Sequence, residues 1–293
     1  YDDSNYSNFL ATTFLFEGDF EQGWKFYDKR ISKINSKYFN IKEWRGENLT
    51  DKKILVFSEQ GLGDTIQFSK YLISLLKISN DVTFLVQKKI LDIFRKDIKG
   101  LTIMPIENFE KKNFDFKIDL GSLIKFFYKD KINNQVEILN ARDDNEVTKL
   151  VKIDRSKMNV GIAWSGSFYG PNEPYRSLNL IDLEKLFELD VNYYCLQNEI
   201  RNSDLNYFQS LNLTDCGNFN LVQIGEIINN LDLVITVDTS ILHLSASLDK
   251  ETWALLNLYP DWRWNEFQKF HTYNSLKLFR QKRFNIWSDI IDD

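Results

Sequence analysis

Short β-rich runs alternate with helical patterns twice along this chain of 293 residues, and this alternation constrains the fold more than any other feature. The order strand, helix, strand brings successive strands into parallel pairing, with helices packed on the sheet. Apolar runs of about four or five residues indicate buried strands, and apolar residues at helical spacing indicate helices. The first series predicts strands over 53–57 and 82–86 and near Leu101 and Phe114, with helices over 64–77 and 88–95.

A second series begins after a charge-rich segment, residues 129–157, which contains Arg142 to Glu146 and is the best candidate for a domain junction. It predicts strands over 159–164, 191–197, 233–237 and 252–256, with helices over 181–189, 221–229 and 240–248. We therefore expect two α/β domains with parallel sheets. Because ligands bind beyond the carboxyl ends of strands in such sheets, we expect the chemistry just after strand ends, in a cleft between the domains.

The N-terminal residues 8–30 have a different pattern. Gly18 ends one helical stretch, and Phe20, Trp24 and Tyr27 recur at the spacing of one helix face. This predicts a helical hairpin, either the last unit of a tetratricopeptide array or an extension docked on the next domain. The first residue is Tyr1, which we interpret as an artificial boundary or a cut within a longer chain.

Composition excludes several classes of function. Lys and Arg number 37 against 42 Asp and Glu, a net charge of -5, so no basic field attracts nucleic acid. Cys195 and Cys216 lack the spacing of a disulfide scaffold, and neither lies beside the His residues that a zinc site needs. The longest apolar runs are far shorter than the roughly 20 residues that span a bilayer, so we expect no membrane span.

The first candidate site follows the strand over 53–57. Gly61 and Gly63 leave the backbone open to a substrate, and Asp64 can accept a proton at the start of the next helix. Alternatively, Asp64 is an N-cap that forms a capping box with Gln67. A dinucleotide fingerprint is absent, since Ile66 stands where the third glycine belongs.

The second candidate site follows the strand over 233–237. In the helix predicted from Ser240, the free N–H groups of Thr239 to Leu242 and the positive dipole end point to where a phosphate could sit, which predicts an anion site at this turn. The alternative is capping by Asp238 or Thr239. His243 is either a buried packing residue or a ligand contact.

Two further segments carry candidate contacts. Trp164 and Ser165 end the strand over 159–164 before a polar loop with Pro171 and Arg176, whose planar fork can hold a diphosphate or can simply be solvated. The aromatic run from Tyr259 to Trp264, which includes Trp262 and Arg263, either clamps a base or sugar or locks the edge of the domain.

Taken together, these segments resemble the glycosyltransferases that follow tetratricopeptide repeats in bacteria, relatives of the heptosyltransferase family (family 9). The motifs that carry the resemblance are Gly18-Asp19-Phe20, Gly23-Trp24, Trp44-Arg45-Gly46, the run from Ser58 to Phe68, Val237-Asp238-Thr239-Ser240 with His243-Leu244, and Pro260-Asp261-Trp262-Arg263-Trp264. The resemblance implies the GT-B architecture: a hairpin over 1–45, a Rossmann-like acceptor domain over 46–155 and a Rossmann-like nucleotide-sugar domain over 156–293. It also implies a cytoplasmic enzyme, which can lie peripherally at the inner membrane.

The resemblance also implies roles for residues. Asp64 looks like the catalytic base, supported by the glycine loop, and Arg176 looks like the cation that steadies the leaving diphosphate, a place taken by Lys in heptosyltransferases. The donor sugar and diphosphate would bind Asp238, Thr239, Ser240 and His243. The possible substrate contacts are Gln60, Trp164, Ser165, Trp262 and Arg263.

The reaction that the resemblance implies is inverting transfer from a nucleotide-sugar to a hydroxyl of a protein or a lipopolysaccharide-type glycan. Nowhere does the sequence separate two Asp residues by one residue, so the metal clamp of the other large glycosyltransferase architecture is absent and we expect no metal and no cofactor. A noncatalytic scaffold that keeps the transferase fold is the main alternative. A sugar-nucleotide epimerase would need more acid/base groups than these.

Overall fold

A computed structural model describes residues 3–29, 40–110, 113–130, 138–139, 151–167, 173–265 and 273–292. The chain divides into two compact units: the first holds residues 1–140 and 261–272, and the second holds 141–260 and 273–293. Most of the predicted junction segment, with Arg142 to Glu146, lies outside the described residues, and so does Pro171. No described helix combines the length and the apolar character that a membrane span requires.

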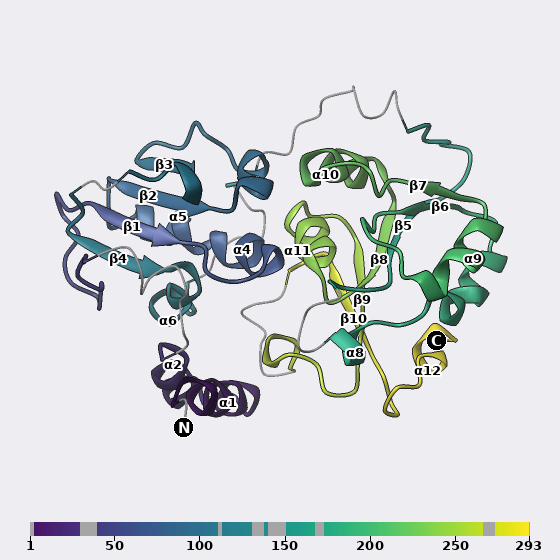
Figure 1. Cartoon of the computed structure of the whole chain (residues 1–293), viewed down its shortest axis with the longest axis horizontal. Helices are drawn as coiled ribbons and strands as arrows, with labels where there is room; N and C mark the ends of the chain where they lie inside the picture. Colours follow the sequence, from purple (N-terminus) through teal and green to yellow (C-terminus); the bar gives the residue numbers. More distant parts are fainter. Residues whose placement is uncertain are drawn as a thin grey trace. The chain divides into compact units, whose positions relative to one another are not determined.

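The first unit contains a parallel sheet of four strands in the order β3-β2-β1-β4 (Figure 1). Its strands are β1 (Ile54–Phe57), β2 (Val82–Val86), β3 (Leu101–Pro105) and β4 (Phe116–Asp119). Helices that connect or follow these strands include α4 (Leu62–Ser69), α5 (Tyr71–Leu76) and α6 (Ile124–Phe127), with 3₁₀ turns η2 (Ile106–Asn108) and η3 (Leu120–Ser122). β1 and β2 are buried along their whole length, because helices and loops cover a parallel sheet on both faces.

The second unit contains a parallel sheet of six strands in the order β10-β9-β8-β5-β6-β7. Its strands are β5 (Asn159–Ala163), β6 (Asn192–Cys195), β7 (Leu213–Asp215), β8 (Leu233–Val237), β9 (Thr252–Leu256) and β10 (Leu276–Arg280). Its helices are α8 (Glu173–Arg176), α9 (Asn202–Ser210), α10 (Leu221–Asn230), α11 (Ser240–Ser247) and α12 (Ser288–Ile291). α10 and α11 lie on one side of the sheet, and α9 and α12 lie on the other (Figure 1).

The prediction of an α/β fold with parallel sheets is confirmed. The helices predicted over 88–95 and 181–189 are present and are of the 3₁₀ type, η1 (Lys88–Ile93) and η4 (Leu180–Glu188). In each, the buried apolar residues are three positions apart, Ile90 with Ile93 and Leu180 with Leu183. A 3₁₀ helix places such residues directly above one another, whereas an α-helix would offset them by roughly 60° around its axis.

Two helices precede the first sheet. α1 (Asp3–Phe16) and α2 (Phe20–Tyr27) are joined by a turn in which Gly18 has a φ of 82°, a value that favours glycine. Asp19 caps α2 by accepting a hydrogen bond from the Gln22 amide at 3.1 Å. The two helices pack closely at Gly23, where an added Cβ would lie 2.6 Å from Cγ of the buried Leu15.

We expect Gly23→Ala to lower the free energy of unfolding by about 1–3 kcal/mol, since the overpacking at Leu15 outweighs the gain in helix propensity. The matched control is Gly225→Ala in α10, where the new methyl group would meet only an ordinary contact at 3.6 Å to Leu248. That control gains about 1 kcal/mol from propensity alone. Urea unfolding measures both changes, and equal effects would contradict the close packing of α1 and α2.

Candidate functional site

Each sheet has a topological switch point, where the connections leave a central strand in opposite directions. In the first unit it lies between β1 and β4, and in the second it lies between β5 and β8. Loops at the carboxyl ends of such strand pairs diverge and leave room for a ligand. The candidate residues after β1, β5 and β8 lie in the loops that follow these strands, so each unit has candidate residues at its own switch point.

In the first unit, the loop after β1 leads into α4. Gly61 is the N-cap of this helix, and the carboxylate of Asp64 accepts a hydrogen bond from the Gly61 amide at 3.0 Å. The prediction that Asp64 is itself the N-cap is therefore wrong. The helix begins two residues earlier, at Leu62, because Gly63 continues it and Asp64 acts from the third helical position. Gln67 lies in the next turn and does not close the capping box.

Hydrogen bonds from three directions fix the loop before α4. The Gln87 amide group donates to the Gln60 carbonyl at 2.9 Å and accepts from the Ser58 hydroxyl at 2.8 Å. The Gln60 side chain donates to the Tyr27 hydroxyl at 2.8 Å, and Glu59 accepts from the Gly121 amide after β4 at 3.3 Å. Gln60, predicted as a substrate contact, thus links the loop to α2.

Gln87 and Glu59 did not appear among the predicted site residues. Gln87 directly follows β2, so the rule that chemistry follows strand ends could have found it. Glu59 stands in the loop after β1, but its partner Gly121 follows β4, and the sequence does not show which strand neighbours β1.

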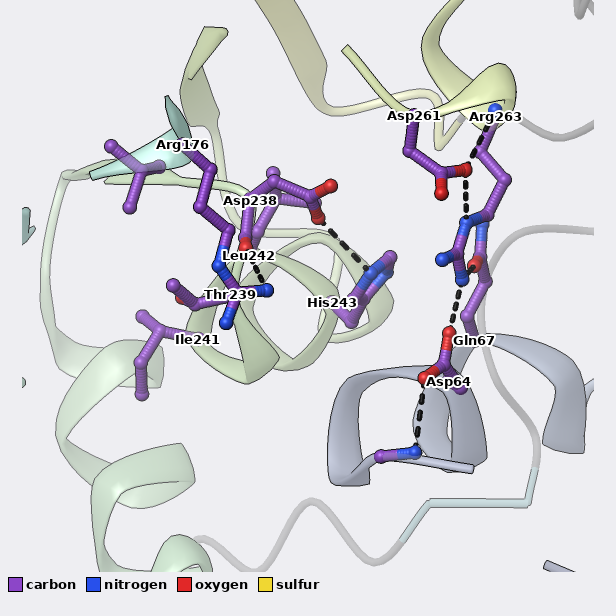
Figure 2. Close-up of polar contacts among 12 residues, drawn as sticks. Asp64, Gln67, Arg176, Asp238, Thr239, Ile241, Leu242, His243, Asp261 and Arg263 are labelled. Atoms are coloured by element: carbon purple, nitrogen blue, oxygen red, sulfur yellow. Dashed lines mark hydrogen bonds and ion pairs between the residues drawn. The ribbon is translucent and has the colours of Figure 1, made fainter. Parts of the chain in front are cut away.

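The structure places Arg263 against Asp64, a contact that the sequence did not indicate. Its guanidinium forms an ion pair with the Asp64 carboxylate and also donates to the Gln67 side chain at 3.1 Å (Figure 2). Its Nε donates to Asp261 at 2.8 Å. The side chains of Asp64 and Arg263 are only 20% and 15% exposed, so solvent screens this ion pair poorly.

Trp262 lies beside this ion pair but is 4% exposed. Its ring packs edge-on against Trp24 and Tyr27, with centroids 5.5 and 6.1 Å apart. Of the two interpretations of the aromatic run, a clamp for a ligand or a lock for the domain, the packing of Trp262 favours the lock.

In the second unit, Arg176 reaches the start of α11. Its guanidinium donates to the carbonyl of Asp238 at 3.4 Å (Figure 2). Gly166 makes room for it, since a Cβ there would lie 2.5–2.7 Å from the guanidinium atoms. A cation is thereby placed next to the positive end of the helix dipole, an arrangement that suits an anion.

α11 begins at Ser240 as predicted, with Thr239 at the N-cap position. The Thr239 side chain makes no capping hydrogen bond; its hydroxyl lies 3.3 Å from that of Thr236. Capping by the Thr239 side chain therefore does not explain this turn. The first amide N–H groups of α11 are directed at the turn that the Arg176 guanidinium also contacts.

His243 is buried and contacts two polar side chains. Its Nε2 lies 3.7 Å from the Asp238 carboxylate, and its Nδ1 lies 3.1 Å from the Tyr273 hydroxyl. Its burial fits the interpretation as a buried residue, and it also lies close to Asp238 from the protein side. Its role as a ligand contact stays a prediction. Tyr273 is far away in the sequence, and nothing in its local pattern indicated this contact.

Ser165 and Trp164 follow β5 but differ in what they can contact. The Ser165 hydroxyl is buried and, among the described residues, has no hydrogen-bond partner. Trp164 is fully buried, and its indole N–H donates to the buried Asp204 at 2.8 Å. The prediction of Trp164 as a substrate contact does not fit this position, since its side chain supports the loop from inside the core.

The described residues show neither a metal-binding cluster nor a reactive thiol. They include no group of three or more His, Cys, Asp or Glu side chains that could hold a metal ion. Cys195 and Cys216 are free and buried, and burial raises the pKa of both thiols to about 12. Neither thiol supplies a thiolate nucleophile near neutral pH.

Residues 196–285 match the family model Glycosyltransferase family 9 (heptosyltransferase). This domain includes the turn before α11 and the pair Asp261 and Arg263. Among curated proteins, none matches this chain.

Solved structures share the fold at low sequence identity. A family 9 glycosyltransferase from Veillonella parvula is 13% identical with a TM-score of 0.57, over 80% of this chain and 87% of its own. Heptosyltransferase II from E. coli is 12% identical with a TM-score of 0.56, over 82% and 94% of the two chains. The heptosyltransferase TibC from enterotoxigenic E. coli is 10% identical with a TM-score of 0.58, over 83% and 67%. The family domain and the shared fold support a glycosyltransferase, with the donor undetermined.

We expect Trp164→Phe to lower the free energy of unfolding by about 1.5–3 kcal/mol, because the buried Asp204 carboxylate loses a hydrogen-bond donor. Trp253→Phe is the control, since its indole donates to the exposed Glu251 at 3.0 Å. Urea unfolding compares the two variants. A loss in Trp164→Phe no larger than in the control would mean that Asp204 does not depend on Trp164.

Proposed function

We propose that this protein is an inverting, metal-independent glycosyltransferase that moves a sugar from a nucleotide-activated donor to a hydroxyl group. The observation that carries the proposal is the complementary chemistry at the two switch points. The first unit supplies a poorly exposed carboxylate, Asp64, and the second supplies a cation, Arg176, at the start of a helix. Glycosyl transfer needs both: a base for the acceptor and a positive environment for the leaving diphosphate.

In the proposed reaction, the acceptor hydroxyl attacks the anomeric carbon as the bond to the diphosphate breaks. Asp64 takes the hydroxyl proton, and Arg176 with the amide groups of Thr239 and Ser240 stabilises the negative charge that grows on the diphosphate. A single displacement inverts the configuration at the anomeric carbon. The buried Ser165 hydroxyl supports a further hydrogen bond to the donor.

Metal independence is supported by the groups that are present. Arg176 and the N-terminus of α11 together offer the charge stabilisation that a divalent ion provides in metal-dependent transferases. His243, held by Tyr273, would keep the Asp238 carboxylate in place beside the donor.

The donor and acceptor are proposed by class. The names of two similar structures contain ADP-heptose and ADP-D-beta-D-heptose, so an ADP-linked sugar is the first donor to test. We propose a protein or a lipopolysaccharide-type glycan as the acceptor, with α1 and α2 as a tetratricopeptide-like unit that contacts a large substrate. A cytoplasmic location, with or without peripheral attachment to the inner membrane, is supported by the two free cysteines.

We expect the binding of a nucleotide-sugar to depend on residues of the second unit. In a thermal-shift screen of UDP-, GDP-, ADP- and CMP-sugars, we expect at least one to raise the melting temperature, because ligand binding stabilises the folded state. Arg176→Ala and Gly166→Ala should each weaken this binding by roughly 10- to 100-fold, the first by removing the guanidinium and the second by displacing it. Arg155→Ala is the control, since this arginine bonds to Asn230 elsewhere in the same unit. If no nucleotide-sugar binds, the scaffold alternative is favoured.

The first unit should supply the base. We expect Asp64→Asn to lower nucleotide release from the donor found in the screen by roughly 10²- to 10⁴-fold, with donor affinity nearly unchanged, because an amide cannot accept the proton. Asp92→Asn, which alters an exposed ion pair with Lys96, is the control. Unchanged turnover in Asp64→Asn would remove Asp64 as the base.

A further inference from the structure

Arg263 reaches Asp64 from a position 199 residues later in the sequence. The segment that carries it belongs to the first unit, although the strands on both sides of it, β9 and β10, belong to the second. The chain therefore leaves the second sheet, contributes a few residues beside α4 and returns. Contacts within the first unit must therefore hold this segment in place.

The backbone of this segment is anchored independently of Asp64. Asp261 caps the short 3₁₀ helix η5 (Trp262–Trp264) by accepting from the Arg263 amide at 3.1 Å. Trp262 packs against the aromatic residues of α2, and the Asn265 side chain donates to the Phe16 carbonyl at the end of α1. α1 and α2 thus hold the segment that presents Arg263.

The guanidinium is also held on its flanks. It lies near the rings of Phe68 and Trp262, with centroid distances of 5.7 and 5.8 Å. Its hydrogen bonds to Gln67 and Asp261 fix its plane. A cation fixed in this way can orient a carboxylate, because little conformational entropy remains to be lost when the pair forms.

Resting on the proposed role of Asp64 as the base, we propose that Arg263 is a positioning residue that orients the Asp64 carboxylate and sets its readiness to accept a proton. One carboxylate oxygen is held by the Gly61 amide and the other by Arg263. The helices α1 and α2 brace this arrangement through Trp262. Arg263, predicted from the sequence as a substrate contact, acts instead through Asp64.

Asp261 adjusts the strength of this pairing. Arg263 of η5 and Asp261, the N-cap of η5, are two charged side chains near Asp64, and Asp261 shares the guanidinium at 2.8 Å. The three side chains together carry a net charge of -1, so proton uptake by Asp64 makes the group neutral. A single arginine without this second carboxylate would resist that protonation more strongly.

The first test follows the Asp64 carboxyl group directly. The carboxyl carbon of Asp64 is titrated by NMR in the full chain without ligand, with the Asp64→Asn spectrum identifying its signal. We expect Arg263→Met to raise the titration midpoint by roughly 1 unit or more, because the cation that favours the carboxylate is lost. Arg263→Lys should keep the midpoint near that of the unchanged chain. Asp261→Asn should lower it, because a negative charge beside the ion pair is lost while the Asn side chain can still cap η5.

The second test measures turnover against pH with the donor found in the screen. We expect Arg263→Met to lower kcat/KM by roughly 10²-fold and to move the acid limb of the profile to higher pH. Arg263→Lys should lose rate without moving the limb, because it restores the charge but not the planar fork. Arg95→Met, which removes an exposed pair with Asp97 in the same unit, is the control for both tests.

The outcomes separate this inference from the proposed function. An unchanged Asp64 midpoint in both Arg263→Met and Asp261→Asn would overturn the positioning role, whatever the protein catalyses. Midpoints that move as expected in a protein that turns over no donor would support the pairing but overturn the proposed function. Should Arg263→Met fail to fold, as circular dichroism would show, the opposite shift expected for Asp261→Asn still decides the role of Arg263.

Discussion

Parallel pairing of buried strands is the constraint on which the rest of this structure depends. In both sheets the strands point the same way, so the loops that follow them gather at one edge. The switch points between β1 and β4, and between β5 and β8, then determine where a ligand can approach. Asp64 in one unit and Arg176 with Asp238 in the other are site candidates because of this topology.

Other protein groups contact the polar residues at these edges through hydrogen bonds and ion pairs. These contacts distinguish them from solvated surface residues. Asp64 is held by a backbone amide and by Arg263, and Asp238 is held through its carbonyl by Arg176 and lies near the buried His243. Groups held in this way keep their geometry before a substrate arrives, which is how preorganised sites lower reaction barriers. The same supports explain the positions of Gly166, Tyr273 and Trp262.

The residues that match the family model and the residues proposed for the site overlap only in part. The family model spans residues 196–285, which include the turn before α11 but neither Asp64 nor Arg176. The similar solved structures extend over four fifths of the chain, and at 10–13% identity they show the fold. The proposed roles of Asp64 and Arg176 therefore rest on the contacts seen in this molecule.

The sequence by itself determined the class of fold, most of the strands and the two turns where the site residues lie, because strand patterns and helix starts are local signals. It misplaced the start of α4 by two residues and missed the 3₁₀ character of η1 and η4. Only the tertiary structure brought Arg263 to Asp64, Tyr273 to His243 and Trp164 to Asp204. Those contacts join residues 30 to 199 positions apart, and such contacts depend on strand order and chain return, which no local pattern encodes.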